Sequence, residues 1–157
     1  FKAIEDIPNI DMKCITWSSN SKGLTWLKKY EKYDDLKHLN EQPLGYTPTH
    51  VGLSVGSEEL SKMSGRRKLL ILITDGAPQY HFNGRRVALP VILKTIVKAY
   101  KMSTKKTPNM LMVGVGYGTH LFENLFKGKF ISCTNEQDLE KFMMKTIRKE
   151  IQRCMSR

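Results

Sequence analysis

The chain has 157 residues, of which 40% are hydrophobic and 26% charged, and these proportions predict one globular domain, residues 1–157, with a sizeable core. Its three cysteines lie far apart without the spacing of a metal site, and no apolar run approaches the roughly 20 residues that cross a bilayer, which argues against a disulfide scaffold and a membrane-spanning helix. The formal net charge is +11, and we expect a cytoplasmic protein with reduced thiols and no membrane partner.

The positive charge is concentrated in the second part of the chain, where residues 94–157 carry 13 basic and 5 acidic side chains. A basic surface attracts nucleic acid or an acidic protein, so a basic nucleic-acid-binding domain is one alternative function. The lysines recur at helical spacing, however, without interleaved aromatic residues that would stack on bases. This pattern favours solvated helix faces and argues against nucleic acid as the partner.

The first part of the chain predicts a helix end, a hairpin and a short helix. The first eight residues share an apolar helix face and end at a proline. Residues 10–17 alternate as a strand does, and residues 24–30 predict a second strand after a turn. The two strands are therefore expected to form a hairpin at a sheet edge. Residues 33–40 predict a short helix, which a loop follows.

Strands and helices alternate through the remainder of the chain. Continuous apolar runs, which are typical of buried parallel strands, occupy residues 68–74, 109–116 and 129–133. Helical patterns occupy residues 49–64, 85–103, 120–126 and 134–155. This alternation predicts an α/β fold, a doubly wound and mostly parallel sheet with one antiparallel edge strand and helices on both faces.

Particular residues mark the expected helix ends. Thr49 is a candidate N-cap for the helix over residues 49–64, and Gly65 a candidate stop. Pro90 has to lie in the first turn of its helix or kink it. Thr134 and Gln137 have the spacing of a capping box. The last helix also carries one apolar stripe that predicts core packing: Leu139, Phe142, Met143, Ile147, Ile151 and Cys154.

Two loops of this predicted fold carry oxygen ligands. In doubly wound sheets, ligands bind at the carboxyl ends of the strands, and Asp75 directly follows such a strand. Thr47 precedes a helix in the loop "GYTPTH", 28 residues earlier. A hydroxyl and a carboxylate are hard ligands that suit Mg²⁺, Mn²⁺ or Ca²⁺. The pair therefore predicts a cation site at the ligand edge of the sheet.

The order of these segments resembles the von Willebrand factor type A family. The segment "GYTPTHVGL", a helix, the strand and turn "RRKLLILITDGAP", a long helix and the strand "NMLMVGVGYG" follow that family's pattern over nearly the whole chain. The sequence "RRKLLILITDGAP" is most similar to that of intracellular bacterial members, such as the A-domain subunit of cobalt chelatase, and of their phage-encoded relatives. Many of these accompany a hexameric AAA+ ATPase.

The resemblance implies a metal-ion-dependent adhesion site and no enzyme activity. It assigns the family's loop threonine to Thr47, with Thr49 as the alternative hydroxyl, and the family's last aspartate to Asp75. The cation would keep one coordination position for an acidic residue of a protein partner. The implied function is a Mg²⁺-dependent binding module that serves an AAA+ ATPase in a chelatase-like or remodelling complex.

One part of the family pattern is missing from this chain. The Asp-x-Ser-x-Ser motif does not occur in it, and the segment "TWSSNS" lacks the aspartate. The family's strand order, 3-2-1-4-5-6, makes the strand before that motif a central one. We therefore expect a domain truncated at its N-terminus, with two part-sheets that have open edges and with weak metal binding.

Four further residues near the predicted edge are candidate contacts for the partner. His50 and His81 flank the two loops, and Gly76 lies in the turn after Asp75. Arg85, with its neighbour Arg86, could meet an acidic partner, although a solvated helix N-terminus explains the pair equally well. Surface histidines without paired spacing are the ordinary explanation for the two imidazoles.

The segment "GVGYG" offers a competing function. Glycines between a strand and a helix could hold a nucleotide or an S-adenosyl cofactor in an α/β transferase. The motif departs from G-x-G-x-x-G, and no acidic residue follows at the distance that ribose recognition needs. A tight turn between strand and helix is the simpler interpretation.

Overall fold

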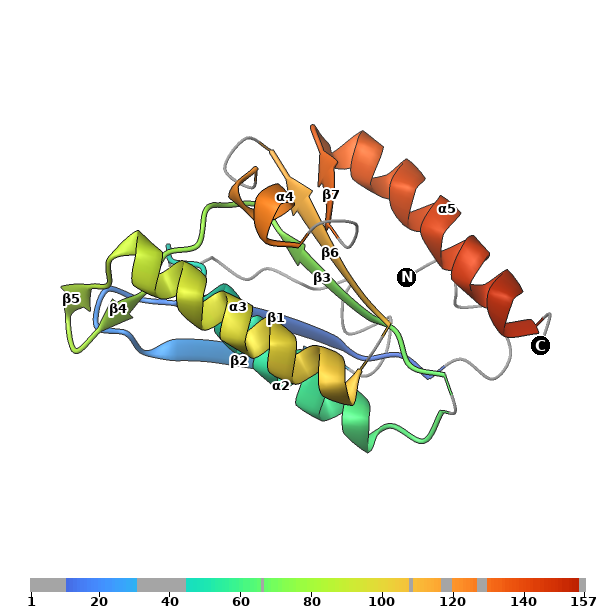
Figure 1. Ribbon diagram of the computed structural model, residues 1–157, viewed down its shortest axis with the longest axis horizontal. Coiled ribbons are helices and arrows are strands. Elements are labelled where there is room, and N and C mark those ends of the chain that lie inside the picture. The colour runs from blue at the N-terminus through green and yellow to red at the C-terminus, as the bar shows by residue number, and fades with distance from the viewer. Residues whose placement is uncertain are drawn as a thin grey trace.

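A computed structural model of the protein describes residues 11–30, 45–65, 67–107, 109–116, 120–126 and 130–155 (Figure 1). Within them it is an α/β structure with a three-stranded parallel sheet and four helices. The helices predicted over the first eight residues and over 33–40 lie outside this part of the chain. None of the helices described is both long enough and apolar enough to cross a membrane.

The predicted N-terminal hairpin is confirmed. Strands β1 (Cys14–Ser19) and β2 (Thr25–Tyr30) pair antiparallel along their full length. The side chain of Asn20 closes the turn, because its Oδ1 accepts hydrogen bonds from the backbone N–H groups of Lys22 and Leu24, each at 3.0 Å. The polar turn residues thus fix the register that the alternating strands require.

The predicted parallel strands are also confirmed. Strand β6 (Met110–Val115) lies between β3 (Leu70–Thr74) and β7 (Phe130–Cys133), and both pairings are parallel. Parallel strands need crossover connections, which helices supply here. The carboxyl ends of β3 and β6 consequently meet at one edge of the sheet (Figure 1).

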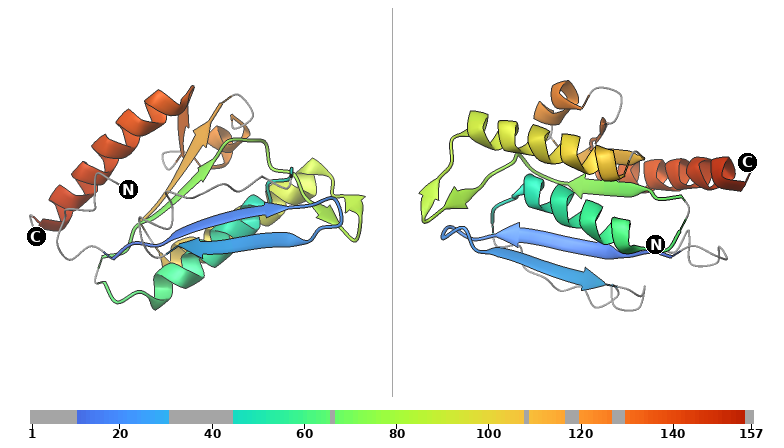
Figure 2. Two further views of the ribbon diagram at one scale, coloured as in Figure 1. Left: turned by 180° about the vertical axis from the view of Figure 1, so that it is seen from behind. Right: turned by 60° about the horizontal axis from the view of Figure 1, so that its bottom comes forward.

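The hairpin and the parallel sheet remain separate, as expected for two part-sheets. Among the described residues, no hydrogen-bonded ladder joins β1 to β3. The two strands run in the same general direction in both Figure 1 and the left view of Figure 2, with no strand drawn between them. One long edge of β3 therefore lacks a partner within the part of the chain that is described.

The core lies between the parallel sheet and three helices, α2 (Thr49–Lys62), α3 (Leu89–Lys106) and α4 (Leu121–Leu125). Its members share one face of the sheet and the inner faces of these helices: Leu53, Leu72, Ile92, Ile96, Ala99, Met110, Met112, Phe122 and Phe126. Ile73 points to the opposite face of β3 and is 38% exposed. The described residues thus place this main core on one face of the sheet. A doubly wound arrangement, with helices packed on both faces, is not established by these residues.

Helix α2 packs against its neighbours mainly through small residues rather than through a stripe of large apolar ones. A Cβ atom added to Gly52 would lie 2.7 Å from the ring of Trp17 in β1, and one added to Gly56 would lie 3.0 Å from Leu70 in β3. Helix α3 packs on another side, where Ser103 donates a hydrogen bond to the carbonyl of Leu53 at 3.2 Å. Helix α2 therefore contacts both sheets and α3 at close range.

The helix predicted over residues 85–103 begins later than expected, at Leu89. Arg85 and Arg86 form strand β5 (Arg85–Arg86), which pairs antiparallel with β4 (His81–Phe82). The prediction of a helix N-terminus at these arginines was wrong. The dipeptide Asn83–Gly84, with φ of 49° and 76°, makes a two-residue hairpin turn of the kind that this sequence favours.

Three predicted helix ends also differ. Helix α2 begins with Thr49, so Pro48 occupies the N-cap position and no side chain caps the helix. It ends at Lys62, with Met63 extended as its C-cap, so Gly65 does not stop it. The N–H of Asp138 bonds to the side chain of Asn135 at 2.9 Å, where a capping box of Thr134 and Gln137 was expected. Pro90 lies in the first turn of α3, as predicted.

Helix α5 (Glu136–Met155) runs beside β7 at the end of the sheet (Figure 1). Its predicted stripe was expected to join the core. Leu139, Phe142 and Met143 are only half-buried and are not members of the core cluster. The side chains of Ile147, Ile151 and Cys154 lie outside the described set.

Candidate functional site

The Thr47 loop is fixed at the carboxyl end of β1. Tyr46 and Ser19 exchange two backbone hydrogen bonds, of 3.0 and 3.2 Å. These bonds form a single antiparallel bridge between the loop and the last residue of β1. The carbonyl of Thr47 accepts hydrogen bonds from the N–H groups of Thr49, at 2.9 Å, and Gln79, at 3.2 Å. The loop is therefore tied both to the start of α2 and to the segment that follows β3.

The turn after β3 lies directly against this loop. Asp75 is exposed, and a Cβ atom added to the next residue, Gly76, would lie 3.9 Å from Oγ1 of Thr47. The hydroxyl of Thr74 donates a hydrogen bond to the carbonyl of Gly76 at 3.4 Å, which folds the turn back over the end of β3. The two loops that carry the predicted ligands, Thr47 and Asp75, thus meet at the ligand edge.

Of the two candidate hydroxyls, Thr47 is the better placed. Thr49 is completely buried, and its Oγ1 donates to the carbonyl of Thr47 at 3.5 Å. Thr47 is half-buried and borders the Asp75–Gly76 turn. An ion that enters from solvent beside Asp75 would meet Thr47 before it met Thr49.

The donor chemistry fits a hard cation, although only in part. A hydroxyl and a carboxylate suit Mg²⁺ or Ca²⁺, which take at least six oxygen ligands. Among the residues described, no group of three or more His, Cys, Asp and Glu side chains comes together. Water or further protein segments would have to supply the other coordination positions.

Two aromatic contacts pack the predicted histidines beside the loops. The ring of His81 lies 4.3 Å from that of Tyr46, and the ring of His50 meets Tyr80 edge-on at 5.0 Å. Nδ1 of each histidine is buried and has no hydrogen-bond partner among the described residues. Burial lowers the pKa of His50, which favours the neutral imidazole. These contacts make both imidazoles part of the packing that holds the loops together.

Sequence reasoning missed the partners that build this edge: Ser19, Tyr46, Gln79 and Tyr80. Tyr46, Gln79 and Tyr80 lie near predicted residues in the chain, whereas Ser19 lies far from all of them in strand β1. The aromatic neighbour of each loop was the one available signal, because Tyr46 precedes Thr47 and Tyr80 precedes His81. Arg85, the remaining candidate, is exposed on β5.

The "GVGYG" segment borders a small pocket at the carboxyl ends of β6 and β7. The pocket has a volume of about 300 Å³ and is lined by Gly116, His120, Ser132, Cys133 and Thr134. That volume is at the lower limit for small-molecule sites. Burial, with a smaller effect of Asp138, raises the pKa of the Cys133 thiol, which keeps it protonated. A thiol in that state is a poor nucleophile.

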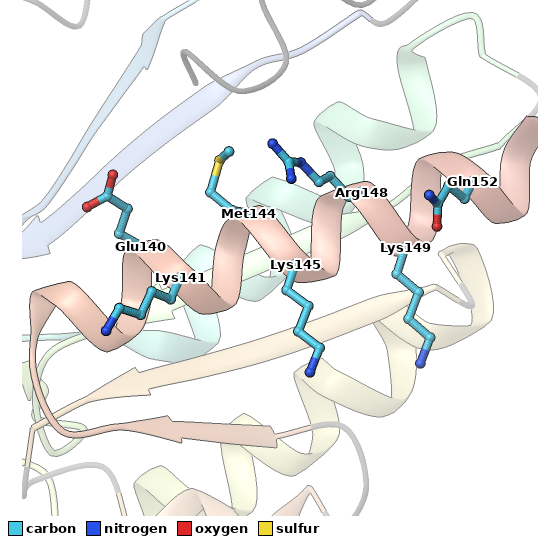
Figure 3. Close-up of a pocket in the computed structure, with 7 residues that line it drawn as sticks. All are labelled: Glu140, Lys141, Met144, Lys145, Arg148, Lys149 and Gln152. Atoms are coloured by element: carbon cyan, nitrogen blue, oxygen red, sulfur yellow. The ribbon is translucent and has the colours of Figure 1, made fainter.

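An open, solvent-facing surface lies along α5 (Figure 3). Every residue that lines it belongs to this single helix: Glu140, Lys141, Met144, Lys145, Arg148, Lys149 and Gln152. Figure 3 shows Lys145 and Lys149 extending from the same side of the helix. The lining contains cations and no aromatic ring, so it lacks the stacking platform of a single-strand binder.

Comparisons with family models, with curated proteins and with solved structures find no match to this chain.

Proposed function

We propose that this protein is a von Willebrand factor type A-like module that binds a protein partner through a divalent cation at Thr47 and Asp75. The observation that carries the proposal is the contact between the two loops. Thr47 and Asp75 are 28 positions apart in the sequence, and the Thr47 hydroxyl lies 3.9 Å from the Cβ position of Gly76, the residue after Asp75. This contact brings the two loops that carry the proposed oxygen donors together at one end of the sheet.

In this proposal, the cation bridges two proteins and catalyses no reaction. Asp75 is exposed, so an ion beside it would keep coordination positions open to solvent. A carboxylate of the partner would fill one of them, because hard cations prefer oxygen ligands. By resemblance, we propose an AAA+ ATPase as the partner, in a chelatase-like or remodelling complex.

The proposed site is completed from elsewhere. The two ligands leave most positions of a six-coordinate ion unfilled. The unpartnered edge of β3 supports a specific source, since a strand that pairs there in parallel would end beside Asp75. We propose that such a strand completes a doubly wound sheet and delivers further oxygen ligands. Mg²⁺ binding by the chain alone is accordingly weak.

Paramagnetic Mn²⁺ provides the test, because it broadens nearby amide signals even at low occupancy. In the whole chain, we expect Mn²⁺ to broaden Thr47 and Gly76 first, and excess Mg²⁺ to reverse the effect. Thr47→Val and Asp75→Asn should reduce the broadening about tenfold at equal Mn²⁺, whereas Thr47→Ser should retain it. Asp75→Asn should keep its stability within about 0.5 kcal/mol, as substitutions of exposed residues usually do, and Thr47→Ser controls for any structural effect at the half-buried Thr47. Equal broadening in Thr47→Val and Thr47→Ser would refute the assignment.

A further inference from the structure

The short β4–β5 hairpin presents two different faces. Residues opposite each other in an antiparallel pair share a face, and consecutive residues alternate between faces. His81 pairs with Arg86, and Phe82 pairs with Arg85. Because His81 packs on Tyr46, the Phe82–Arg85 pair projects from the opposite face. Phe82 is 61% exposed there.

The hairpin holds this aromatic residue in a fixed position. The N–H of Val87 bonds to the carbonyl of Tyr80 at 3.0 Å, which continues the pairing beyond the two short strands. Gly23, in the β1–β2 turn, lies so close that a Cβ atom on it would clash with the His81 carbonyl oxygen. The two turns lie side by side at one end of the molecule in both figures (Figures 1 and 2).

The neighbouring β1–β2 turn contributes a second exposed apolar residue, Leu24. Leu24 follows Gly23, whose Cβ position is 3.5 Å from Cα of Phe82, and Leu24 is 57% exposed. We call Leu24, Phe82 and Arg85 the hairpin-tip surface. Aromatic residues and arginine are enriched at protein interfaces, where they dominate the binding energy. Ordering costs little on a surface that is already fixed by its neighbours.

The two described segments that supply the hairpin-tip surface carry charges of one sign. No acidic residue occurs in residues 12–30 or in residues 76–122, the two segments that supply the surface. Lys22, Arg85 and Arg86 are all exposed, and the structure gives the two arginines no ion pair among the described residues. The surface therefore complements a negatively charged partner.

From these observations we infer that the hairpin-tip surface binds an acidic protein segment that carries an apolar side chain. The apolar side chain packs on Phe82 and Leu24, and a carboxylate pairs with the planar guanidinium of Arg85. A second copy of this chain fits poorly, because its own charge of +11 would be repelled. The inference rests on the proposed function in naming the same acidic partner, since His81 on the other hairpin face packs beside the Thr47 loop.

The test is an NMR titration of the whole chain with a synthetic peptide of glutamates around a central Leu-Phe pair. We expect shifts confined to Leu24, Phe82 and Arg85 in EDTA as well as in Mg²⁺. Phe82→Ala and Arg85→Gln should each weaken binding at least about fivefold. Met102→Ala is the matched control, because that side chain is also 57% exposed but lies toward the far end of α3.

Three results would overturn the inference. The first is a peptide with glutamines in place of glutamates that binds equally well. The second is a set of shifts located on α5. The third is binding to anionic lipid vesicles that Phe82→Ala abolishes while the peptide causes no shift, which would make this a membrane contact. Failure of the proposed cation site leaves a separate signature, because the EDTA titration would still succeed.

Discussion

Replacement of Gly52 by alanine should weaken the packing of α2 against β1. The added Cβ atom would lie 2.7, 2.9 and 3.0 Å from Cε2, Cδ2 and Cζ2 of Trp17. Real Cβ atoms essentially never approach other heavy atoms this closely, and all three contacts are to one rigid ring. Either the indole or the helix has to move. Helix α2 begins two residues after Thr47, so a shift of the helix would also displace the candidate site.

The magnitude follows from two opposing effects. Alanine is favoured over glycine inside a helix by about 1 kcal/mol, while overpacking a core contact costs about 1–3 kcal/mol. The net destabilisation of Gly52→Ala is therefore about 0–2 kcal/mol. Gly56→Ala is the matched control, because its Cβ atom would meet only Cδ1 of Leu70, at 3.0 Å, the far end of a flexible side chain. The same helix preference should leave Gly56→Ala neutral or more stable.

Urea denaturation followed by circular dichroism measures the difference between these two variants. We expect Gly52→Ala to be less stable than Gly56→Ala by about 1–3 kcal/mol, since the helix preference cancels between them and the overpacking cost remains. Adding Trp17→Leu should relieve most of the cost of Gly52→Ala, and the double-mutant cycle measures that coupling. If Gly52→Ala were as stable as Gly56→Ala, the close contact between α2 and Trp17 would be refuted.

Three other changes probe separate parts of the fold. Hydrogen bonds from Lys29 and, to a smaller extent, Lys62 lower the pKa of Glu59 from 4.5 to about 2. The ionised carboxylate should therefore stabilise the fold fully above pH 4.5, and this stabilisation should be lost as the pH falls to about 2. Glu59→Gln should remove that pH dependence in acid titrations of unfolding, and an unchanged slope would contradict it. Gly84→Ala should cost about 1 kcal/mol, because Gly84 has a φ of 76° and its Cβ position has no heavy atom within 4 Å, which leaves a purely conformational effect. Faster exchange of the Val87 amide, which closes the hairpin, would report it, and unchanged exchange would argue against it. Leu53→Ala should cost about 2–5 kcal/mol in urea denaturation, because Leu53 is completely buried, and a loss below about 1 kcal/mol would mean that the site is not packed.

Sequence periodicity predicted the elements whose signal is local. The alternation in β1 and the continuous apolar runs of β3 and β6 identified strand type and orientation, because the buried faces of a strand are visible in its own residues. Helix α2 was predicted in its approximate range, although Thr49 does not cap it and Gly65 does not stop it. Its buried face consists largely of Gly52, Gly56 and small polar residues, and hydrophobic periodicity does not register glycine as a contact.

The β4–β5 hairpin shows how two local signals can compete. Asn83–Gly84 favours a tight hairpin turn, whereas the apolar residues after Arg86 have helical spacing. Both signals were valid, and the boundary between them falls at Ala88, the N-cap of α3. The helical pattern was extended too far toward the N-terminus because the two arginines fit either structure. Tertiary contact with Gly23 and Tyr46 favours the strand.

The candidate site was predictable in its location but not in its support. The order of strands and helices indicated that Thr47 and Asp75 share one sheet edge, since parallel strands end on the same side. The support of the site depends on loop conformation, as in the hydrogen bond from Gln79 to Thr47 and the packing of Tyr80 on His50. Loops have no repeating sequence pattern from which these contacts could be predicted. Such contacts require coordinates.

These supporting contacts make the approach of the two loops independent of the strand that is expected to pair with β3. The Thr47 loop is held by the backbone bridge to Ser19 and by the hydrogen bond from Gln79, and neither involves the free edge of β3. The two loops that carry the proposed ligands are therefore in contact without a strand paired to that edge among the described residues. A segment that completed the sheet would add ligands to a preorganised pair, so its effect on cation affinity should exceed its effect on the distance between the two loops. Mn²⁺ broadening of Thr47 and Gly76, measured with and without such a segment, would distinguish this order of assembly from one in which the strand itself brings the loops together.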